Sequence, residues 1–157
     1  MEEAALESLQ RLFVAALAAA EARQVDRAEE LLRAVLRQEP RLPEPRLELA
    51  RLHLEAGRLD DAEQDALEAI GWLEQGGRWL DELTDEQELS LAHNLVGEAL
   101  RQKLDDDEVV FGDAAVYTSL LERSKRHFKQ AAQLDPDNAH AAWHDQVLDP
   151  GASGEQD

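Results

Sequence analysis

The sequence contains no cysteine and few aromatic residues, and both shortages restrict what the chain can be. Without cysteine, neither a disulfide nor a metal site built from thiolates is possible. Aromatic residues make up 4% of the 157 residues, and the hydrophobic 43% consists mainly of leucine and alanine. Because β-branched residues are also few, the composition favours helix almost throughout and leaves little material for a sheet. The length is that of one ordinary domain with a core of its own.

Basic residues are the next shortage. Sixteen lysines and arginines oppose thirty-five acids, which gives a formal net charge of −19, and only three of the bases are lysines. A field this negative repels phosphates at long range, so we expect neither nucleic acid nor an anionic membrane as a partner. Two explanations stay open. One is a specific basic partner, and the other is adaptation of the whole surface to a salty cytoplasm, where high ionic strength screens the self-repulsion.

Long hydrophobic runs are also lacking. The apolar run from Leu12 to Ala20 is too short to span a bilayer, and the acidic start at Glu2 and Glu3 differs from the basic start of a signal peptide. We therefore expect a soluble cytoplasmic protein.

What the sequence does contain is a segment that occurs twice, 34 residues apart. Within this segment six pairs of residues are identical at this offset, among them Ala16 and Ala50, Glu21 and Glu55, Ala28 and Ala62, and Glu29 and Glu63. A fixed period of this length is typical of helical repeats, in which one hairpin cannot bury its apolar face alone and stacks on a neighbour. The four alanines allow the helices of a hairpin to approach closely, and Gly57 is expected to end a helix in the left-handed conformation.

On these residues the chain resembles a tetratricopeptide repeat (TPR) protein. The resemblance predicts an all-α fold, a right-handed α-α superhelix (TPR solenoid) of about three helical hairpins plus a short C-terminal capping helix. We expect the TPR-like domain to cover residues 1–148, with its parts at these positions: hairpins at about 4–39, 43–76 and 84–135, and the capping helix at 138–148. The polar residues 149–157 are expected to be disordered.

The third unit departs from the period through two insertions, residues 77–83 and 105–112. Its second helix restores the pattern, because two sets of residues have the same spacing: Ser124, Phe128, Ala131 and Pro136 against Ala28, Leu32, Val35 and Pro40. We therefore interpret it as a repeat with longer helices. Four N-caps are predicted, two of them with capping-box partners: Asp26, Asp60 with Glu63, Thr84 with Gln87, and Asp113.

No catalytic constellation stands out, so we expect a non-catalytic protein without a cofactor. The sequence has no glycine-rich phosphate loop and no Ser-His-Asp order above chance. His140 and His144 stand four residues apart on the predicted terminal helix, but two ligands do not make a metal site and the sequence fixes no third. No metal site is therefore predicted, and exposed helix histidines are the favoured interpretation.

The two insertions carry apolar residues of their own. Val109, Val110 and Phe111 follow an acidic run, and they either tuck back on the third hairpin, which we favour, or form an exposed contact point. The acidic run lacks the alternating oxygen ligands and central glycine of a calcium loop, so it is interpreted as a solvated loop. Trp72 and Trp79 are expected to bury the base of the first insertion.

The resemblance also implies a binding groove, because the first helices of TPR hairpins line a concave face that usually holds a peptide or a helix of a partner. By register, the expected groove residues are Phe13, Leu17, Glu21, Leu47, Arg51, Leu54, Glu55, Asn94, Glu98 and Arg101. Some TPR domains grip a C-terminal carboxylate with basic residues. Here Phe13 and Leu17 stand in the first unit and Leu91 and Leu95 in the third, so that clamp is not expected.

Two functions of different classes follow as hypotheses. The leading one is a non-catalytic protein-protein interaction module or adaptor, with the groove leucines and Phe13 supplying contact area and Arg51 or Arg101 setting the orientation. The alternative is a structural self-associating protein, a homodimer for example, joined through Trp143 at the end of the array or through the Phe111 loop.

Overall fold

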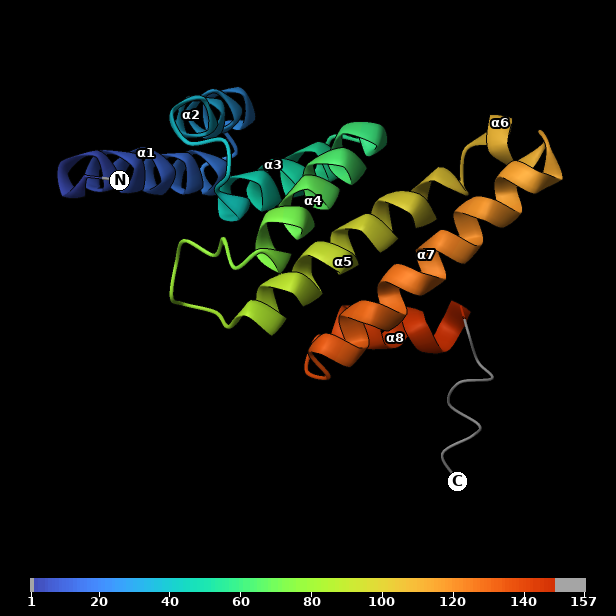
Figure 1. The fold of residues 1–157 in the computed structure, drawn as a ribbon. Helices are drawn as coiled ribbons and strands as arrows, with labels where there is room; N and C mark the ends of the chain where they lie inside the picture. The colour runs from blue at the N-terminus through green and yellow to red at the C-terminus, as the bar shows by residue number, and fades with distance from the viewer. Residues whose placement is uncertain (1, 149–157) are drawn as a thin grey trace.

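The computed structural model describes residues 2–148 and places them in eight helices arranged in chain order (Figure 1). Their bounds are α1 Glu3–Glu21, α2 Val25–Gln38, α3 Pro43–Glu55, α4 Leu59–Glu74, α5 Asp85–Lys103, α6 Asp107–Val110, α7 Ala114–Leu134 and α8 Ala139–Leu148. The predicted disordered tail, residues 149–157, lies outside the described residues. Within them, no helix is long and apolar enough to cross a membrane.

The helices pair into hairpins, α1 with α2, α3 with α4, and α5 with α7, and α8 packs on α7 at the end of the stack. Each hairpin also covers the next, because α2 packs on α3 and α4 packs on α5. The hairpins follow one another along the molecule in Figure 1 instead of closing into a bundle. The predicted all-α superhelix of about three hairpins with a short C-terminal helix is therefore confirmed.

Two clusters of buried side chains fill the spaces between the hairpins. The first joins α1 and α2 to α3, and the second joins α4, α5 and α7 to α3. The four alanines of the repeat, at 16, 28, 50 and 62, are almost or entirely inaccessible to solvent. A larger side chain at these sites would separate the helices, so close approach of the backbones explains why the repeat has alanine there.

The turn inside each of the first two hairpins uses the left-handed conformation. Gly57 has φ +76° as predicted, and Arg23, the residue 34 positions earlier, has φ +61°. A non-glycine residue in this region costs on the order of 1 kcal/mol. The repeat therefore keeps the geometry of the turn even where the residue type does not favour it.

Two of the predicted caps are confirmed. The Thr84 hydroxyl accepts from Gln87 N at 3.1 Å while the Gln87 side chain accepts from Thr84 N at 2.9 Å, and Asp113 Oδ1 accepts from Ala115 N at 2.9 Å. The predictions for Asp26 and Asp60 were wrong, because the N-caps of α2 and α4 are Gln24 and Arg58, two residues earlier, which places both acids inside the first turn. A negative charge there still stabilises the N-terminus of a helix.

The connection between α4 and α5, residues 75–84, contains the first insertion and folds back toward the beginning of the chain (Figure 1). Trp79 and Leu80 pack against the first buried cluster, and the rings of Trp79 and Phe13 lie 5.6 Å apart. Trp72 is half-buried, as Trp79 is. In Figure 1 this connection leaves α4, runs toward α1 and returns to α5.

The second insertion forms the single turn α6, and here the favoured interpretation was wrong for two of three residues. Val109 packs against the second cluster, whereas Val110 is 47% and Phe111 84% exposed. Successive residues of a helical turn point about 100° apart, so a turn that faces Val109 inward turns the next two outward.

In the third hairpin, α5 and α7 approach each other at Gly97. Ser124 Oγ donates to the Gly97 carbonyl at 2.9 Å, and a Cβ on Gly97 would lie 3.0 Å from the Phe128 ring. Gly97 therefore replaces the alanine of the other repeats because Phe128, which is completely buried, occupies that space.

Candidate functional site

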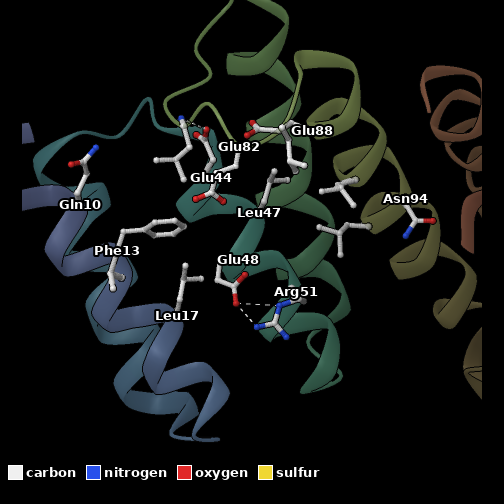
Figure 2. Close-up of a pocket in the computed structure, with 15 residues that line it drawn as sticks. Gln10, Phe13, Leu17, Glu44, Leu47, Glu48, Arg51, Glu82, Glu88 and Asn94 are labelled. Atoms are coloured by element: carbon white, nitrogen blue, oxygen red, sulfur yellow. Dashed lines mark hydrogen bonds and ion pairs between the residues drawn. The ribbon is translucent and has the colours of Figure 1, made fainter. Parts of the chain in front are cut away.

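A cavity of about 580 Å³ opens between α1, α3 and α5, and part of the first insertion forms a further wall (Figure 2). Fifteen side chains line it: Gln10, Phe13, Val14, Leu17, Glu44, Leu47, Glu48, Arg51, Leu80, Glu82, Leu83, Glu88, Leu91, Asn94 and Leu95. Its size lies in the range of ligand-binding pockets.

The repeat itself builds this cavity. The lining positions of α1 have equivalents on α3 that lie 34 residues later, and three of those on α3 have equivalents on α5 that lie a further 47 residues later. They are Gln10, Phe13, Val14 and Leu17 on α1, Glu44, Leu47, Glu48 and Arg51 on α3, and Leu91, Asn94 and Leu95 on α5. Spacings of three and four residues place side chains on one face of a helix. Each hairpin therefore turns the same face of its first helix toward the cavity.

Half of the predicted groove residues line this cavity. Those that do are Phe13, Leu17, Leu47, Arg51 and Asn94. The remaining five, Glu21, Leu54, Glu55, Glu98 and Arg101, lie one or two turns further along the same helices. The cavity is thus lined by the N-terminal and central turns of the first helices, and not by their C-terminal ends.

Sequence reasoning missed residues of two kinds. Gln10 and Glu44 lie on the predicted face one turn nearer the N-terminus, and Val14 and Glu48 lie on it between predicted groove residues, so the same periodicity would have found them. The residues of the insertion had no such signal, because their position depends on a side chain more than thirty residues away.

That side chain is Glu44, which anchors the insertion to α3. Its Oε2 accepts from Trp79 N at 2.9 Å and from Leu80 N at 2.8 Å. The carboxylate thereby satisfies two backbone donors in a segment without regular secondary structure. Glu44 is 7% exposed, and the wall of the cavity depends on this contact.

Glu88, at the beginning of α5, faces Glu44 at the same end of the cavity (Figure 2). Burial, the negative charge of Glu44 and a hydrogen bond with Glu44 raise the pKa of Glu88 to about 8. The carboxyl group of Glu88 is therefore largely protonated at pH 7. Its Oε2 is buried and has no hydrogen-bond partner within residues 2–148.

Arg51 is the one basic residue among the fifteen that line the cavity. Its guanidinium bonds Glu48 and also Glu55, with Nη1 2.6 Å from Glu55 Oε1. The hydrogen bond with Glu48 contributes most to raising the pKa of Arg51. Arg51 is already paired with Glu48 and Glu55, so the lining at the end near the insertion stays acidic through Glu44 and Glu82, with the protonated Glu88 beside Glu44.

Two histidine clusters lie outside the cavity. The Nδ1 atoms of His93 and His127 are 2.9 Å apart, and burial lowers the pKa of both, that of His127 to about 4. In the second cluster, His140 and His144 of α8 face Glu98 of α5. His140 is exposed as expected, but His144 is 8% exposed, so the expectation of two exposed histidines was wrong for His144.

Comparison with known proteins agrees with the fold. Residues 19–64 match a family model described as tetratricopeptide repeat. The solved TPR domain of Arabidopsis OM64 is similar over 92% of this chain and 97% of that domain, with a TM-score of 0.69 and 16% sequence identity. At this identity the likeness concerns the fold alone. None of the curated proteins matches the sequence.

Proposed function

We propose that this chain, a tetratricopeptide repeat protein as its 34-residue period predicted, is a non-catalytic interaction module that binds an apolar and basic segment of a partner protein between α1, α3 and α5. TPR proteins are typically interaction modules and not enzymes. The observation that carries the proposal is the cavity, which has an apolar floor and one acidic end.

The floor supports an apolar contact. Leucines at 17, 47, 91 and 95 line the cavity together with Phe13 and Val14. Val14 is 63% and Leu91 44% exposed, so both still have apolar area to lose on binding. Burial of apolar area is the main source of affinity when a helix or peptide enters a groove.

The acidic end supports a cationic contact. The raised pKa of Glu88 keeps its carboxyl group protonated beside Glu44, and Glu88 Oε2 lacks a partner although it is buried. A lysine or arginine of the partner would satisfy that oxygen and favour the ionised form of Glu88, which then loses its proton to solvent. The net charge of −19 would also speed the approach of a basic segment.

The test is a selection of short random peptides displayed against the immobilised protein. We expect enriched peptides that combine apolar residues at helical spacing with a lysine or arginine. Synthetic versions should bind the wild type at least about tenfold more tightly than versions with glutamate in place of the base. Fluorescence anisotropy measures the affinities.

A matched pair of variants checks the location. Leu47→Asp places a charge in the cavity and should abolish binding, whereas Leu54→Asp makes the same change two turns along α3, outside the cavity, and should leave binding intact. Equal binding by the wild type and Leu47→Asp, with unchanged helix content by circular dichroism, would refute the groove. Enrichment of acidic peptides would refute the proposed chemistry.

Self-association stays the second candidate, because apolar side chains are exposed at the end of the stack. Trp143 is 58% and Val147 52% exposed on α8, the last described helix, and Phe111 is 84% exposed on the second insertion. A second copy of the chain could cover either surface. Sedimentation velocity at several protein concentrations in high salt distinguishes this candidate, since it alone predicts a dimer without a partner.

A further inference from the structure

At the end of the stack, two histidines of α8 lie beside a glutamate of α5 that is more than forty residues away in the sequence. His140 and His144 project from α8, and Glu98 projects from α5. Glu98 Oε2 lies 3.8 Å from His140 Nε2 and 3.7 Å from His144 Nε2. One ligand atom from each residue falls within 4.8 Å of the others.

These distances suit a tetrahedral ion. With ligand bonds of about 2.0–2.1 Å, neighbouring ligand atoms of a tetrahedral zinc ion lie about 3.4 Å apart. The two Glu–His distances exceed that value by only a few tenths of an ångström. The ligand atoms of the two histidines lie within 4.8 Å of each other, so a rotation of the exposed His140 side chain would bring all three atoms to bonding distance.

The surroundings orient the three groups. His140 Nδ1 lies 2.8 Å from Asn94 Oδ1, so Nδ1 carries the hydrogen and the Nε2 lone pair faces Glu98. The ring of His144 stacks on Phe128, with centroids 4.6 Å apart and planes 16° from parallel. Glu98 is held by Arg101 and by Gln102, whose Nε2 donates to Oε1 at 3.0 Å.

Two of the three side chains are buried and the third is open to solvent, which leaves a side from which an ion could enter. Glu98 and His144 are both 8% exposed, whereas His140 is open to solvent. Arg101 Nε also donates to Glu98 Oε2, at 2.8 Å. An oxygen with two lone pairs can accept this bond and still coordinate an ion on the side of the histidines, although the guanidinium charge lowers the affinity for a cation.

We propose that Glu98, His140 and His144 bind a zinc-class divalent ion. Two imidazoles and one carboxylate form a borderline-soft donor set that suits Zn²⁺ better than Mg²⁺ or Ca²⁺. The fourth position faces solvent on the side of His140 and takes water or a donor from a partner. The ion would connect α8 to α5 and stabilise the end of the stack, independently of what the cavity binds.

The test is a titration of the chelator-treated protein with Zn²⁺ by calorimetry, in millimolar Mg²⁺ to occupy the many surface carboxylates. We expect one equivalent of Zn²⁺ to bind and the melting temperature to rise with it. His140→Gln and Glu98→Gln should each weaken Zn²⁺ binding by more than about a hundredfold, and Asn94→Leu, which removes the bond that orients His140, by about tenfold.

The other histidine pair supplies the control. His93 belongs to no group of three metal-ligating side chains among residues 2–148. The Zn²⁺ affinity of the His93→Gln variant should therefore equal that of the wild type. His140 is exposed, and His140→Gln should therefore fold normally by circular dichroism. Unchanged Zn²⁺ affinity in His140→Gln and Glu98→Gln, or no saturable binding in Mg²⁺, would overturn the proposal.

Discussion

Glu88 is an ionisable side chain that the fold keeps almost entirely out of water. It is 3% exposed, and the carboxylate beside it, Glu44, is 44 residues away in the sequence. Glu44 also holds the backbone of Trp79 and Leu80. Glu44 and Glu88 therefore connect α3, α5 and the first insertion. The protonation of Glu88 thus bears on the packing of all three segments.

Glu88 makes the stability of the protein depend on pH. Its pKa is raised from 4.5 to about 8 in the folded state, so between these values the folded protein holds a proton that the unfolded chain releases. The contribution of Glu88 to the free energy of unfolding is fully present below about pH 4.5. It is lost as the pH rises toward about 8, by at most about 1.4 kcal/mol per pH unit. We expect Glu88→Gln, which keeps a neutral side chain, to lose less stability over this range.

Urea denaturation at intervals from about pH 5 to about pH 8 measures the effect as the difference in the free energy of unfolding. Glu86→Gln is the matched control, because Glu86 is exposed on the same helix. Its pH dependence should follow that of the wild type. Parallel curves for the wild type and Glu88→Gln would show that Glu88 is ionised in the folded protein.

At the scale of the helices, Gly97 sets how closely α5 approaches α7. A methyl group at this position would lie 3.0–3.1 Å from three atoms of the Phe128 ring, and the stacked ring of His144 restricts the movement of Phe128. We expect Gly97→Ala to destabilise the protein by about 1 kcal/mol. Overpacking costs roughly 1–3 kcal/mol, whereas alanine improves helix propensity by about 1 kcal/mol.

The control substitution is Gly71→Ala, because Gly71 lies inside α4 and an added methyl group would meet no atom within 4 Å. Helix propensity then acts alone and should stabilise the protein by up to about 1 kcal/mol. Thermal or urea unfolding measures both variants. A stabilised Gly97→Ala protein would show that the space beside Phe128 can accommodate a methyl group.

The sequence was sufficient where a helix is determined by its own residues. Thr84 and Asp113 cap their helices as predicted because capping is local, and the alanine pairs identified the close contacts. The cap predicted at Asp60 was two residues too late because α4 starts earlier, and the Asp60 carboxylate instead lies 2.6 Å from Lys103 Nζ. Phe111 was misplaced because a single turn buries only one of its consecutive apolar residues.

The candidate sites required contacts that no sequence spacing encodes. The periodicity identified the inward face of α1, α3 and α5 but not the wall that the insertion adds, since Glu44 determines that wall. Likewise, His140 and His144 had the spacing of a ligand pair, but the third ligand, Glu98, comes near them only because α8 and α5 both pack on α7. Both sites depend on the stacking of repeats.

For the whole molecule, the excess of acids acts on every hairpin. Most of the basic side chains already form ion pairs within the protein. For example, Arg33 Nη2 lies 2.7 Å from Glu29 Oε1, and Lys103 Nζ lies 2.7 Å from Glu63 Oε1. With sixteen bases against thirty-five acids, most of the remaining acids repel one another. Folding brings these charges closer together, so the repulsion opposes the folded state more than the unfolded one.

Salt should therefore stabilise this protein strongly if the acidic surface is an adaptation to a salty cytoplasm. The Debye length falls from about 10 Å at 0.1 M to about 3 Å at 1 M, which screens exposed charges on neighbouring helices. We expect the melting temperature to rise by about 5 °C or more over this range of KCl, because about 1 kcal/mol corresponds to roughly 2–4 °C at this size. A flat response would reject salt adaptation and favour the alternative, in which the acids serve a basic partner. An equal rise with an uncharged osmolyte would show that general exclusion from the surface, and not screening, is the cause.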